Sequence, residues 1–171
     1  MISFLSLAES RYSVRKFDQK QISKKELDTI LRAGQVAPTA VNKQPQKIIV
    51  IQNEAGLERV RSVTKYAFNA PTVLMVLADK DVAWVAPDGE CSGPVDAAIV
   101  ITQMMLQAWD IGIGSCWVRG FDKNAMVKAF DIPDNLDLVA LLPLGYPEAG
   151  SKPAGGWHDK RKPLDETVIY I

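Results

Sequence analysis

The stretch Pro71-Thr72-Val73-Leu74-Met75-Val76-Leu77 decides the fold, because it is a run of mostly apolar residues opened by a proline. A short run of this kind predicts a buried strand. A longer apolar segment follows and reaches to about Trp109. Pro94 stands at the start of that segment, where its missing N–H costs nothing, so the segment predicts a long buried helix.

Outward from this strand and helix, the sequence predicts an alternation of helices and strands. Ser23-Lys24-Lys25-Glu26 has the pattern of a capping box and predicts a helix that stops before Pro38. The other expected elements are helices over Ile2–Ser10 (with Phe4, Leu5 and Leu7 facing a core), 55–64 and 123–130, strands over 47–52, 138–144 and 167–171, an extended segment over 115–118, and a loop or short irregular helix over 79–93. Such an alternation implies a sheet that helices cover on both faces.

Length and composition fit a single globular domain. The chain has 171 residues, of which 47% are hydrophobic and 23% charged, so a disordered or collagen-like protein is excluded. The formal net charge is zero, which disfavours a nucleic-acid binder and makes self-association easier. We expect one domain over 1–171, in which residues 148–171 form a connector and a last strand that closes its own sheet or a partner's.

The cysteine and histidine content narrows the chemistry. Cys91 and Cys116 are the two cysteines, and His158 is the single histidine. This number excludes a disulfide framework and most Cys/His zinc sites, so we expect no metal centre. Few cysteines and an N-terminus unlike a signal peptide favour a cytoplasmic protein. The apolar segment over 95–118 is interrupted by carboxylates and amides, which favours burial in the protein over a membrane span.

Arg11-Tyr12-Ser13-Val14-Arg15-Lys16-Phe17 is the strongest candidate for a binding site. If the stretch is extended, Arg11, Ser13 and Arg15 share one face, and if it is helical the two arginines still do. Two guanidinium groups that point the same way suit a phosphate, which accepts bidentate, charge-assisted hydrogen bonds. Taken alone, the stretch also fits a solvated charged surface.

A second candidate is Ala37-Pro38-Thr39-Ala40-Val41-Asn42-Lys43-Gln44-Pro45, which joins a helix to a strand. Open α/β sheets often bind ligands at such junctions. The side-chain amides of Asn42 and Gln44 each offer a donor and an acceptor, which suits the edge of a heteroaromatic ring. A turn in which Asn42 bonds its own backbone is the alternative.

Three later blocks follow these two segments along the chain. The five blocks are Arg-x-Ser-x-Arg-x-Phe (11–17), Ala-Pro-x-x-x-Asn-x-Gln-Pro (37–45), Gly-Ile-Gly-Ser-Cys-Trp-Val-Arg-Gly-Phe (112–121), Leu-Pro-Leu-Gly-Tyr-Pro (142–147) and Arg-Lys-Pro-Leu-Asp-Glu-Thr-Val (161–168). In this order, over nearly the whole chain, they resemble the FMN-dependent nitroreductase family. Each block is weak alone, but five in order are fairly specific.

The resemblance implies an α+β fold, an α/β/α three-layer sandwich with a mixed, largely antiparallel sheet. It also implies an intertwined homodimer with FMN at the interface and a C-terminal strand exchanged with the partner. NADH or NADPH would reduce FMN, which would pass the electrons to a small acceptor such as a nitroaromatic or a quinone, with ping-pong kinetics. The cofactor carries this chemistry, so no catalytic side chain is expected.

The resemblance further assigns cofactor-binding residues by position. They are Arg11, Tyr12, Ser13, Arg15, Asn42, Gln44, Arg119, Gly120 and Arg161. The arginines and serine of the first block, with the arginine of the last, would hold the phosphate and the N1 side of the ring, while the tyrosine adds backbone and stacking. The two amides would meet the ring or the ribityl chain, at least one of them from the other subunit. The Arg-Gly pair would approach the ring near N5 through its backbone.

The chain departs from the family pattern in places that bear on the substrate. Tyr12 stands where a second arginine is common, Gln46 where an aromatic residue often follows, and Asp159 where many members have lysine. The segment over 79–93 is shorter than the helical insertion that covers the pocket in longer members, so we expect a more open pocket. Two alternatives stay open: a flavin-binding module (carrier, sensor or scavenger) without NAD(P)H turnover, and an enzyme that depends on Cys116.

Overall fold

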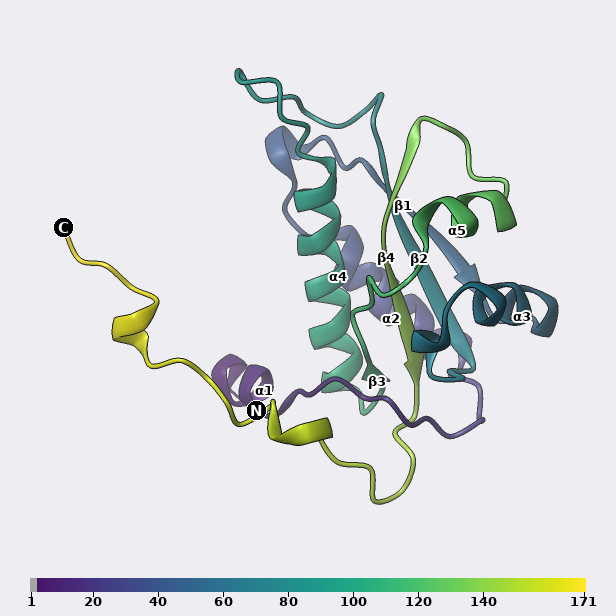
Figure 1. Ribbon diagram of the computed structural model, residues 1–171. Helices are drawn as coiled ribbons and strands as arrows, with labels where there is room; N and C mark the ends of the chain where they lie inside the picture. Colours follow the sequence, from purple (N-terminus) through teal and green to yellow (C-terminus); the bar gives the residue numbers. More distant parts are fainter. Residues whose placement is uncertain (1–2) are drawn as a thin grey trace.

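The centre of the molecule is an antiparallel sheet. In the computed structural model, which describes residues 3–171, four strands pair in the order β1-β2-β4-β3 (Figure 1). Their bounds are β1 Gln46–Ile51, β2 Thr72–Asp79, β3 Gly114–Ser115 and β4 Leu136–Gly145. Every named strand pair is antiparallel, and a single bridge between Ser13 and Ser115 is parallel. The predicted strands over 47–52, 73–77 and 138–144 are therefore confirmed.

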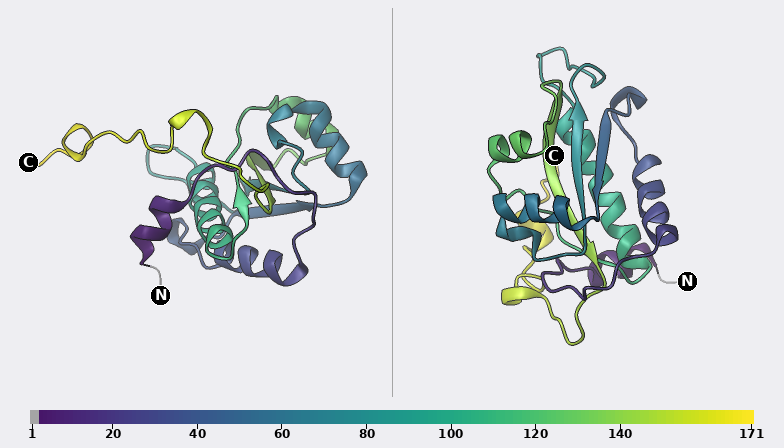
Figure 2. Two further views of the ribbon diagram at one scale, coloured as in Figure 1. Left: turned by 90° about the horizontal axis from the view of Figure 1, so that it is seen from below. Right: turned by 90° about the vertical axis from the view of Figure 1, so that its right-hand side faces the viewer.

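Helices cover both faces of the sheet. The helices of the described residues are α1 Phe4–Ser10, α2 Lys24–Gln35, α3 Glu54–Val63, α4 Gly93–Asp110 and α5 Lys123–Ala129. Helices α2 and α4 lie on one face, and α3 and α5 lie on the other (Figure 2). The α/β/α three-layer sandwich is confirmed. None of the helices within residues 3–171 has the length and apolarity that a membrane span requires.

Strand β2 contributes side chains to two hydrophobic cores, one on each face of the sheet. All of its residues are buried, and alternate side chains point to opposite faces. Leu74 and Val76 pack in the core with α2 and α4, whereas Val73 and Met75 pack in the core with α3 and α5. A shift in register between β2 and β4 follows Val76. This strand is buried on both sides, which explains why its sequence is a continuous apolar run.

Local signals begin the predicted helices: side-chain caps at α2 and α5, and a proline at α4. Ser23 Oγ accepts a hydrogen bond from the Glu26 N–H at 3.2 Å, and the Glu26 carboxylate accepts one from the Ser23 N–H at 2.7 Å. Asp122 Oδ1 accepts from the Ala125 N–H at 3.0 Å and begins α5. Pro94 lies in the first turn of α4. These contacts confirm the capping box and the positions at which α4 and α5 begin.

Two predictions, one at each end of the chain, are wrong within a single chain. Ile2 lies outside the described residues. Phe4 and Leu5 are 71% and 65% exposed, so the prediction that they face a core is wrong within one chain. The reason is that α1 lies on the outside of α4 (Figure 1), and the arm borders only its C-terminal end, so no element within residues 3–171 covers Phe4 and Leu5.

The predicted strand over 167–171 also does not form within one chain. This segment follows a short helical turn, Leu164–Glu166, and pairs with no strand among the described residues. Ile169 and Tyr170 are 88% and 91% exposed. Figure 1 shows the reason: the C-terminal arm (yellow) runs away from the sheet, so its last residues do not lie beside a strand.

Candidate functional site

The Arg11–Phe17 stretch is fixed against the end of the sheet. The Val14 N–H donates to the Ser115 carbonyl at 2.9 Å, and the Val14 side chain is fully buried. Gly114 permits this contact, because a Cβ at that position would lie 2.7 Å from a methyl carbon of Val14. The stretch is extended, with a bridge at Ser13. The residues on either side of Val14 therefore point away from the core.

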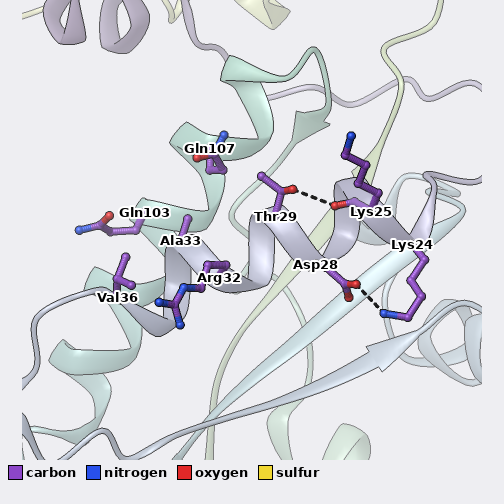
Figure 3. Close-up of a pocket in the computed structure, with 9 residues that line it drawn as sticks. All are labelled: Lys24, Lys25, Asp28, Thr29, Arg32, Ala33, Val36, Gln103 and Gln107. Atoms are coloured by element: carbon purple, nitrogen blue, oxygen red, sulfur yellow. Dashed lines mark hydrogen bonds and ion pairs between the residues drawn. The ribbon is translucent and has the colours of Figure 1, made fainter.

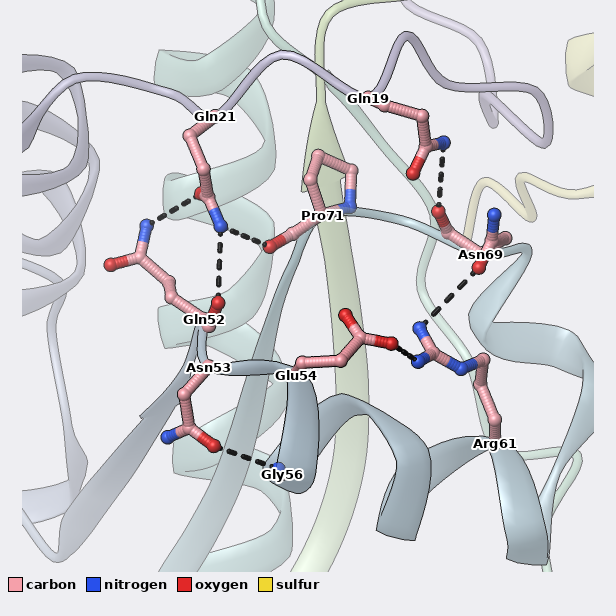
Figure 4. Close-up of polar contacts among 9 residues, drawn as sticks. All are labelled: Gln19, Gln21, Gln52, Asn53, Glu54, Gly56, Arg61, Asn69 and Pro71. Carbon is pink, nitrogen blue, oxygen red and sulfur yellow. Dashed lines mark hydrogen bonds and ion pairs between the residues drawn. The ribbon is translucent and has the colours of Figure 1, made fainter.

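A glutamine network fastens the chain just beyond this stretch (Figure 4). Gln19 Nε2 donates to the carbonyl of Asn69 at 3.3 Å. Gln21 Nε2 donates to the carbonyls of Pro71 and Gln52, at 2.8 and 3.2 Å. These bonds join the segment to the start of β2 and the end of β1. The chain is thus fixed beyond the C-terminal end of the extended stretch.

The exposed side of the stretch lines a cavity of about 190 Å³, here called the arginine cavity. Its lining residues are Arg11, Tyr12, Ser13, Arg15, Pro153, Ala154, Trp157, His158 and Arg161. The predicted common face of Arg11, Ser13 and Arg15 is therefore present, and Arg161 joins it from the C-terminal arm. Three guanidinium groups and no described carboxylate line this space, so its chemistry favours an anion.

Arg11 is the least satisfied of these side chains. Its Nη1 is buried and has no hydrogen-bond partner among residues 3–171. Burial lowers the pKa of Arg11, and the nearby charge of Arg161 lowers it further. Leaving a buried charged donor unpaired costs more than the roughly 1–3 kcal/mol of a neutral one. An anion in the cavity would remove this cost.

A second cavity, of about 490 Å³, adjoins the first and is here called the aromatic cavity. It is lined by Arg15, Tyr66, Phe68, Cys116, Trp117, Val118, Arg119, Gly120, Ala154 and Trp157. Arg15, Ala154 and Trp157 line both cavities. A ligand with an anionic end and a flat ring can therefore place its two ends in neighbouring spaces.

Arg15 is held between two aromatic rings at the border of the cavities. Its guanidinium carbon lies 5.9 Å from the ring centre of Phe68 and 5.7 Å from that of Trp157. Its Nη1 also donates to the carbonyl of Ser13 at 3.3 Å. Cation–π contacts of this kind orient the guanidinium without neutralising it. Arg15 thus keeps its full charge for a ligand.

The Arg119–Gly120 peptide is fixed on the far side of the aromatic cavity. Thr64 is buried, and its Oγ1 donates to the Gly120 carbonyl at 2.6 Å. A Cβ on Gly120 would lie 2.6 Å from the ring of Tyr66, so glycine is required for this contact. The neighbouring Val118 pairs with Leu141 of β4. A backbone anchored at these points presents its polar groups to a ligand in a constant position.

Cys116 is a poor candidate for a nucleophile. The side chain is buried, and burial raises the pKa of its thiol, although Arg15 and the hydrogen bond from Ser13 act in the opposite direction. A raised pKa leaves little of the reactive thiolate at neutral pH. His158 lines the arginine cavity, whereas Cys116 lines the aromatic one, so the two do not form a pair there.

Asn42 and Gln44 lie at the other end of the molecule from the arginines. The Ala40 N–H donates to Asp96, in the first turn of α4, at 2.8 Å. Ser10, next to the arginine stretch, accepts a hydrogen bond from Trp109 in the last turn of α4 at 2.9 Å. With a rise of about 1.5 Å per residue, these two points of α4 are roughly 20 Å apart. One chain does not bring the amides to the cavities.

The loop that carries the two amides has a strained backbone. Val41, Asn42 and Gln44 have φ values of 50°, 54° and 50°, in the left-handed region. A β-branched residue such as Val41 is rare there, and each such residue costs on the order of 1–3 kcal/mol. Gln44 Nε2 donates to the Asn42 carbonyl at 3.2 Å, so the self-bonded turn is formed by Gln44 and not by the Asn42 side chain.

A larger hollow, of about 730 Å³, lies elsewhere (Figure 3). It is an open groove between α2 and α4, and its lining includes Lys24, Asp28 and Gln103. Lys24 and Asp28 pair with each other, so their charges are satisfied. Gln103 also borders a second hollow over α1 and α4. The two hollows flank the outer face of α4 and share no residue with the arginine or aromatic cavity.

Comparison with known proteins agrees with this geometry. The model of the nitroreductase family matches residues 8–70 and 64–146, which include the arginine stretch, the amide loop and the Arg119–Gly120 peptide. The chain belongs to the nitroreductase family. The predicted family is confirmed by this match.

One nitroreductase family protein and two further relatives match most of the chain. A nitroreductase family protein from Clostridium difficile 630 has 35% sequence identity and a TM-score of 0.92, over 99% of this chain and 98% of that one. A structure described as an oxidoreductase containing FMN has 26% identity and a TM-score of 0.77, over 95% and 89%. An NADH dehydrogenase from Thermus thermophilus is 25% identical over 198 residues, which cover 95% of this chain and 93% of that protein.

Sequence reasoning did not mark several residues in and beside the two cavities, and four of them make contacts described above. They are Thr64, Tyr66, Phe68 and Trp157. Three of them lie on one short segment after α3, which forms a 3-10 turn over Lys65–Ala67 and has no periodicity that marks them in the sequence. Trp157 stands alone in a Gly-rich connector, and nothing in the sequence indicates that it lies beside Arg15.

Proposed function

We propose that this chain is an FMN-dependent NAD(P)H oxidoreductase. The observation that carries the proposal is the buried, unpartnered Arg11 Nη1 in a cavity lined by three arginines, within a nitroreductase-family chain. A phosphate monoester matches this donor set in charge and geometry. The neighbouring aromatic cavity offers flat apolar walls for a ring. The relative named as an oxidoreductase containing FMN supports the same cofactor.

The residues of the chain have distinct tasks in this proposal. Arg11, Ser13 and Arg161 hold the phosphate, and Arg15 faces the N1 side of the ring, where a positive charge stabilises added negative charge. Arg119 and Gly120 present their backbone groups to the ring edge near N5. FMN, when bound, supplies a carrier that takes a hydride from NAD(P)H and passes two electrons to the acceptor. No acidic or basic catalytic side chain is required.

The net reaction balances with a small acceptor. NAD(P)H, one proton and a quinone give NAD(P)⁺ and the hydroquinone, so the reductant loses two electrons and the acceptor gains them. A nitroaromatic is the other acceptor class that fits. Nicotinamide and acceptor use one cavity in turn, which gives ping-pong kinetics. One relative is named NADH dehydrogenase and another NADPH-dependent oxidoreductase, and both names support a nicotinamide reductant.

We propose further that two copies of the chain complete each site. The exposed face of α4 carries Val95 and Ile99, and Phe4 of α1 lies beside them around a hollow of about 450 Å³. A second copy that packs antiparallel on this face would bring its Asn42 and Gln44 to the cavities of the first. This arrangement supplies the cover that Phe4 lacks within one chain.

In the same dimer, residues 1–171 act as one domain whose arm, residues 148–171, reaches the partner. The exposed residues at 168–171 would then pair with an edge of the partner's sheet. The two unpaired cysteines among the described residues agree with a cytoplasmic location. No nucleic-acid or membrane partner enters this proposal.

The absorbance spectrum of the purified chain tests the function. We expect flavin bands after addition of FMN and removal of the excess, and anaerobic NADH or NADPH should bleach them. Flavin bands that persist with both nucleotides would favour the alternative, a flavin-binding module without turnover. A protein that fails to retain FMN would contradict both.

A further inference from the structure

Arg119 is a cation on a rigid support at the rim of the aromatic cavity. The Phe121 N–H donates to the Arg119 carbonyl at 2.9 Å, and the next carbonyl, that of Gly120, accepts from Thr64. The residue before it, Val118, pairs with Leu141 of β4 in both directions, at 2.9 and 3.0 Å. The backbone of Arg119 is thus fixed, while its side chain is exposed and lines the cavity.

The charge of Arg119 is not neutralised. Within residues 3–171 its guanidinium makes no hydrogen bond and no ion pair, whereas Arg61 pairs with Glu54 and Lys123 pairs with Asp137. None of the described residues that line the aromatic cavity is acidic. A ligand in this cavity therefore meets a positive charge that nothing in the chain offsets.

The other cations near the cavity are already engaged. Arg15 lies between the rings of Phe68 and Trp157, and it belongs to the proposed cofactor site. Lys65 Nζ lies 5.5 Å from the ring centre of Tyr66. Arg119 is the cation that stays available to a second molecule in the same cavity.

The remaining lining determines the shape of such a molecule. The rings of Tyr66 and Phe68 meet edge to face, with centres 6.1 Å apart, and Trp117 adds a further flat surface. Aromatic walls favour a planar ring, and a guanidinium at the rim favours a carboxylate, which it binds with two parallel hydrogen bonds. The two preferences together describe one class of ligand.

We propose that the electron acceptor is a planar aromatic carboxylate and that Arg119 is the residue that selects it. This inference rests on the proposed function and names the substrate class of the same site. With 4-nitrobenzoate as the probe, NAD(P)H, one proton and the nitro compound give NAD(P)⁺, the nitroso compound and water. The nitro group gains two electrons and loses one oxygen as water, and the carboxylate is unchanged.

The test compares 4-nitrobenzoate with 4-nitrobenzamide, which has the same shape but no charge. The kcat/KM ratio of the two compounds is measured for the unmodified 171-residue chain, for Arg119→Gln and for Lys128→Gln, each loaded with FMN. Lys128 is an exposed cation on α5, outside both cavities, and serves as the matched control. We expect the ratio to fall about tenfold in Arg119→Gln, because one charge-assisted contact is lost, and to stay unchanged in Lys128→Gln. Arg119→Lys should restore part of it.

A binding measurement without turnover provides the second readout. Benzoate and benzamide are titrated into the FMN-loaded protein and their dissociation constants are compared. We expect benzoate to bind about tenfold more weakly to Arg119→Gln than to the unmodified chain, with little change for benzamide. An equal loss for both compounds, or no loss for benzoate, would overturn the proposal.

Two outcomes separate this inference from the proposed function. If the protein retains FMN and reduces 4-nitrobenzamide but its ratio of activities is the same in Arg119→Gln, the substrate class is wrong and the proposed function stands. If Arg119→Gln changes only the relative rates of flavin reduction by NADPH and NADH, Arg119 binds the phosphate that distinguishes NADPH from NADH. The acceptor proposal is then overturned.

Discussion

The two ends of α4 carry two unlike parts of the proposed site. At its C-terminal end, Val14 is buried against Gly114, and the arginine cavity is held by the sheet itself. At its N-terminal end, Asn42 and Gln44 lie on a strained, exposed loop that makes one side-chain anchor, from Ala40 to Asp96. At the C-terminal end, Arg11 Nη1 has no hydrogen-bond acceptor among the described residues. At the N-terminal end, the side-chain amides of Asn42 and Gln44 line neither the arginine cavity nor the aromatic cavity. In the proposed dimer, each end would meet the complementary end of the other copy and complete a site with it.

The largest effect is expected from a substitution that prevents two copies of the chain from associating, because the two ends of α4 could then not form a shared site. Ile99→Asp places a carboxylate in the apolar face of α4, where burying it would cost several kcal/mol. We expect the dimer to weaken by more than about a hundredfold and FMN retention to be lost with it. Sedimentation velocity measures the first and absorbance the second. Asn124→Asp, on the exposed surface of α5, is the control, and a dimeric Ile99→Asp protein would contradict this interface.

Arg11→Ala tests the C-terminal end alone. It removes a charge-assisted contact worth about 1.5–3 kcal/mol, so FMN should bind roughly tenfold to 150-fold more weakly. The dissociation constant is measured by quenching of flavin fluorescence. Lys16→Ala is the matched control, because Lys16 lies in the same stretch but outside both cavities. Unchanged affinity in Arg11→Ala would remove Arg11 from the cofactor site.

Removal of residues 167–171 tests the arm. Val168, Ile169 and Tyr170 are exposed within one chain, and burying even part of their apolar surface on a partner contributes more than about 1.4 kcal/mol. We expect the truncated dimer to dissociate about tenfold more readily in sedimentation equilibrium. An equally stable dimer would show that the arm does not cross.

A mixed dimer tests which chain provides the amides. Gln44→Ala loses a neutral hydrogen bond, so FMN should bind about threefold to tenfold more weakly. Co-expression with Arg11→Ala, under two affinity tags, gives a hybrid in which one site collects both substitutions and the other is intact. The hybrid should bind one FMN per dimer with the affinity of the unmodified protein. Two weakened sites, one with the loss seen for Arg11→Ala and the other with the smaller loss seen for Gln44→Ala, would show that both residues act within one chain.

Glu26→Gln is expected to have the smallest effect. It should change the free energy of unfolding but not the proposed site at either end of α4. Hydrogen bonds from Ser23, and then from Tyr146, lower the pKa of Glu26. Its contribution is therefore present above the unfolded value of about 4.3 and is lost as the pH falls through the lower, folded value. We expect less than about 1 kcal/mol of destabilisation at pH 7, shrinking in acid, with FMN affinity unchanged. Chemical denaturation at several pH values measures it.

The sequence predicted those parts of the molecule whose signals are local. The apolar run of β2, the proline at the start of α4 and the side-chain caps at Ser23 and Asp122 each act within a few residues, and each is found as predicted. The common face of Arg11, Ser13 and Arg15 belongs to the same class, because it depends only on an extended backbone.

The features that sequence could not predict are contacts between distant segments. The hydrogen bond from Thr64 to Gly120 and the position of Trp157 beside Arg15 depend on how loops meet, and no periodicity records them. The exposed Phe4 is a different case. Its helix was predicted, but no element within residues 3–171 covers the Phe4 side chain.

In the proposed dimer, the roughly 20 Å between the two ends of α4 would make cofactor retention depend on protein concentration. If each FMN is held by residues of both copies, binding and association share one equilibrium, so each strengthens the other by mass action. Dilution towards the dissociation constant of the dimer would release flavin, and an excess of flavin would hold the dimer together. The occupancy of the protein in a cell would then follow its abundance as well as the supply of FMN.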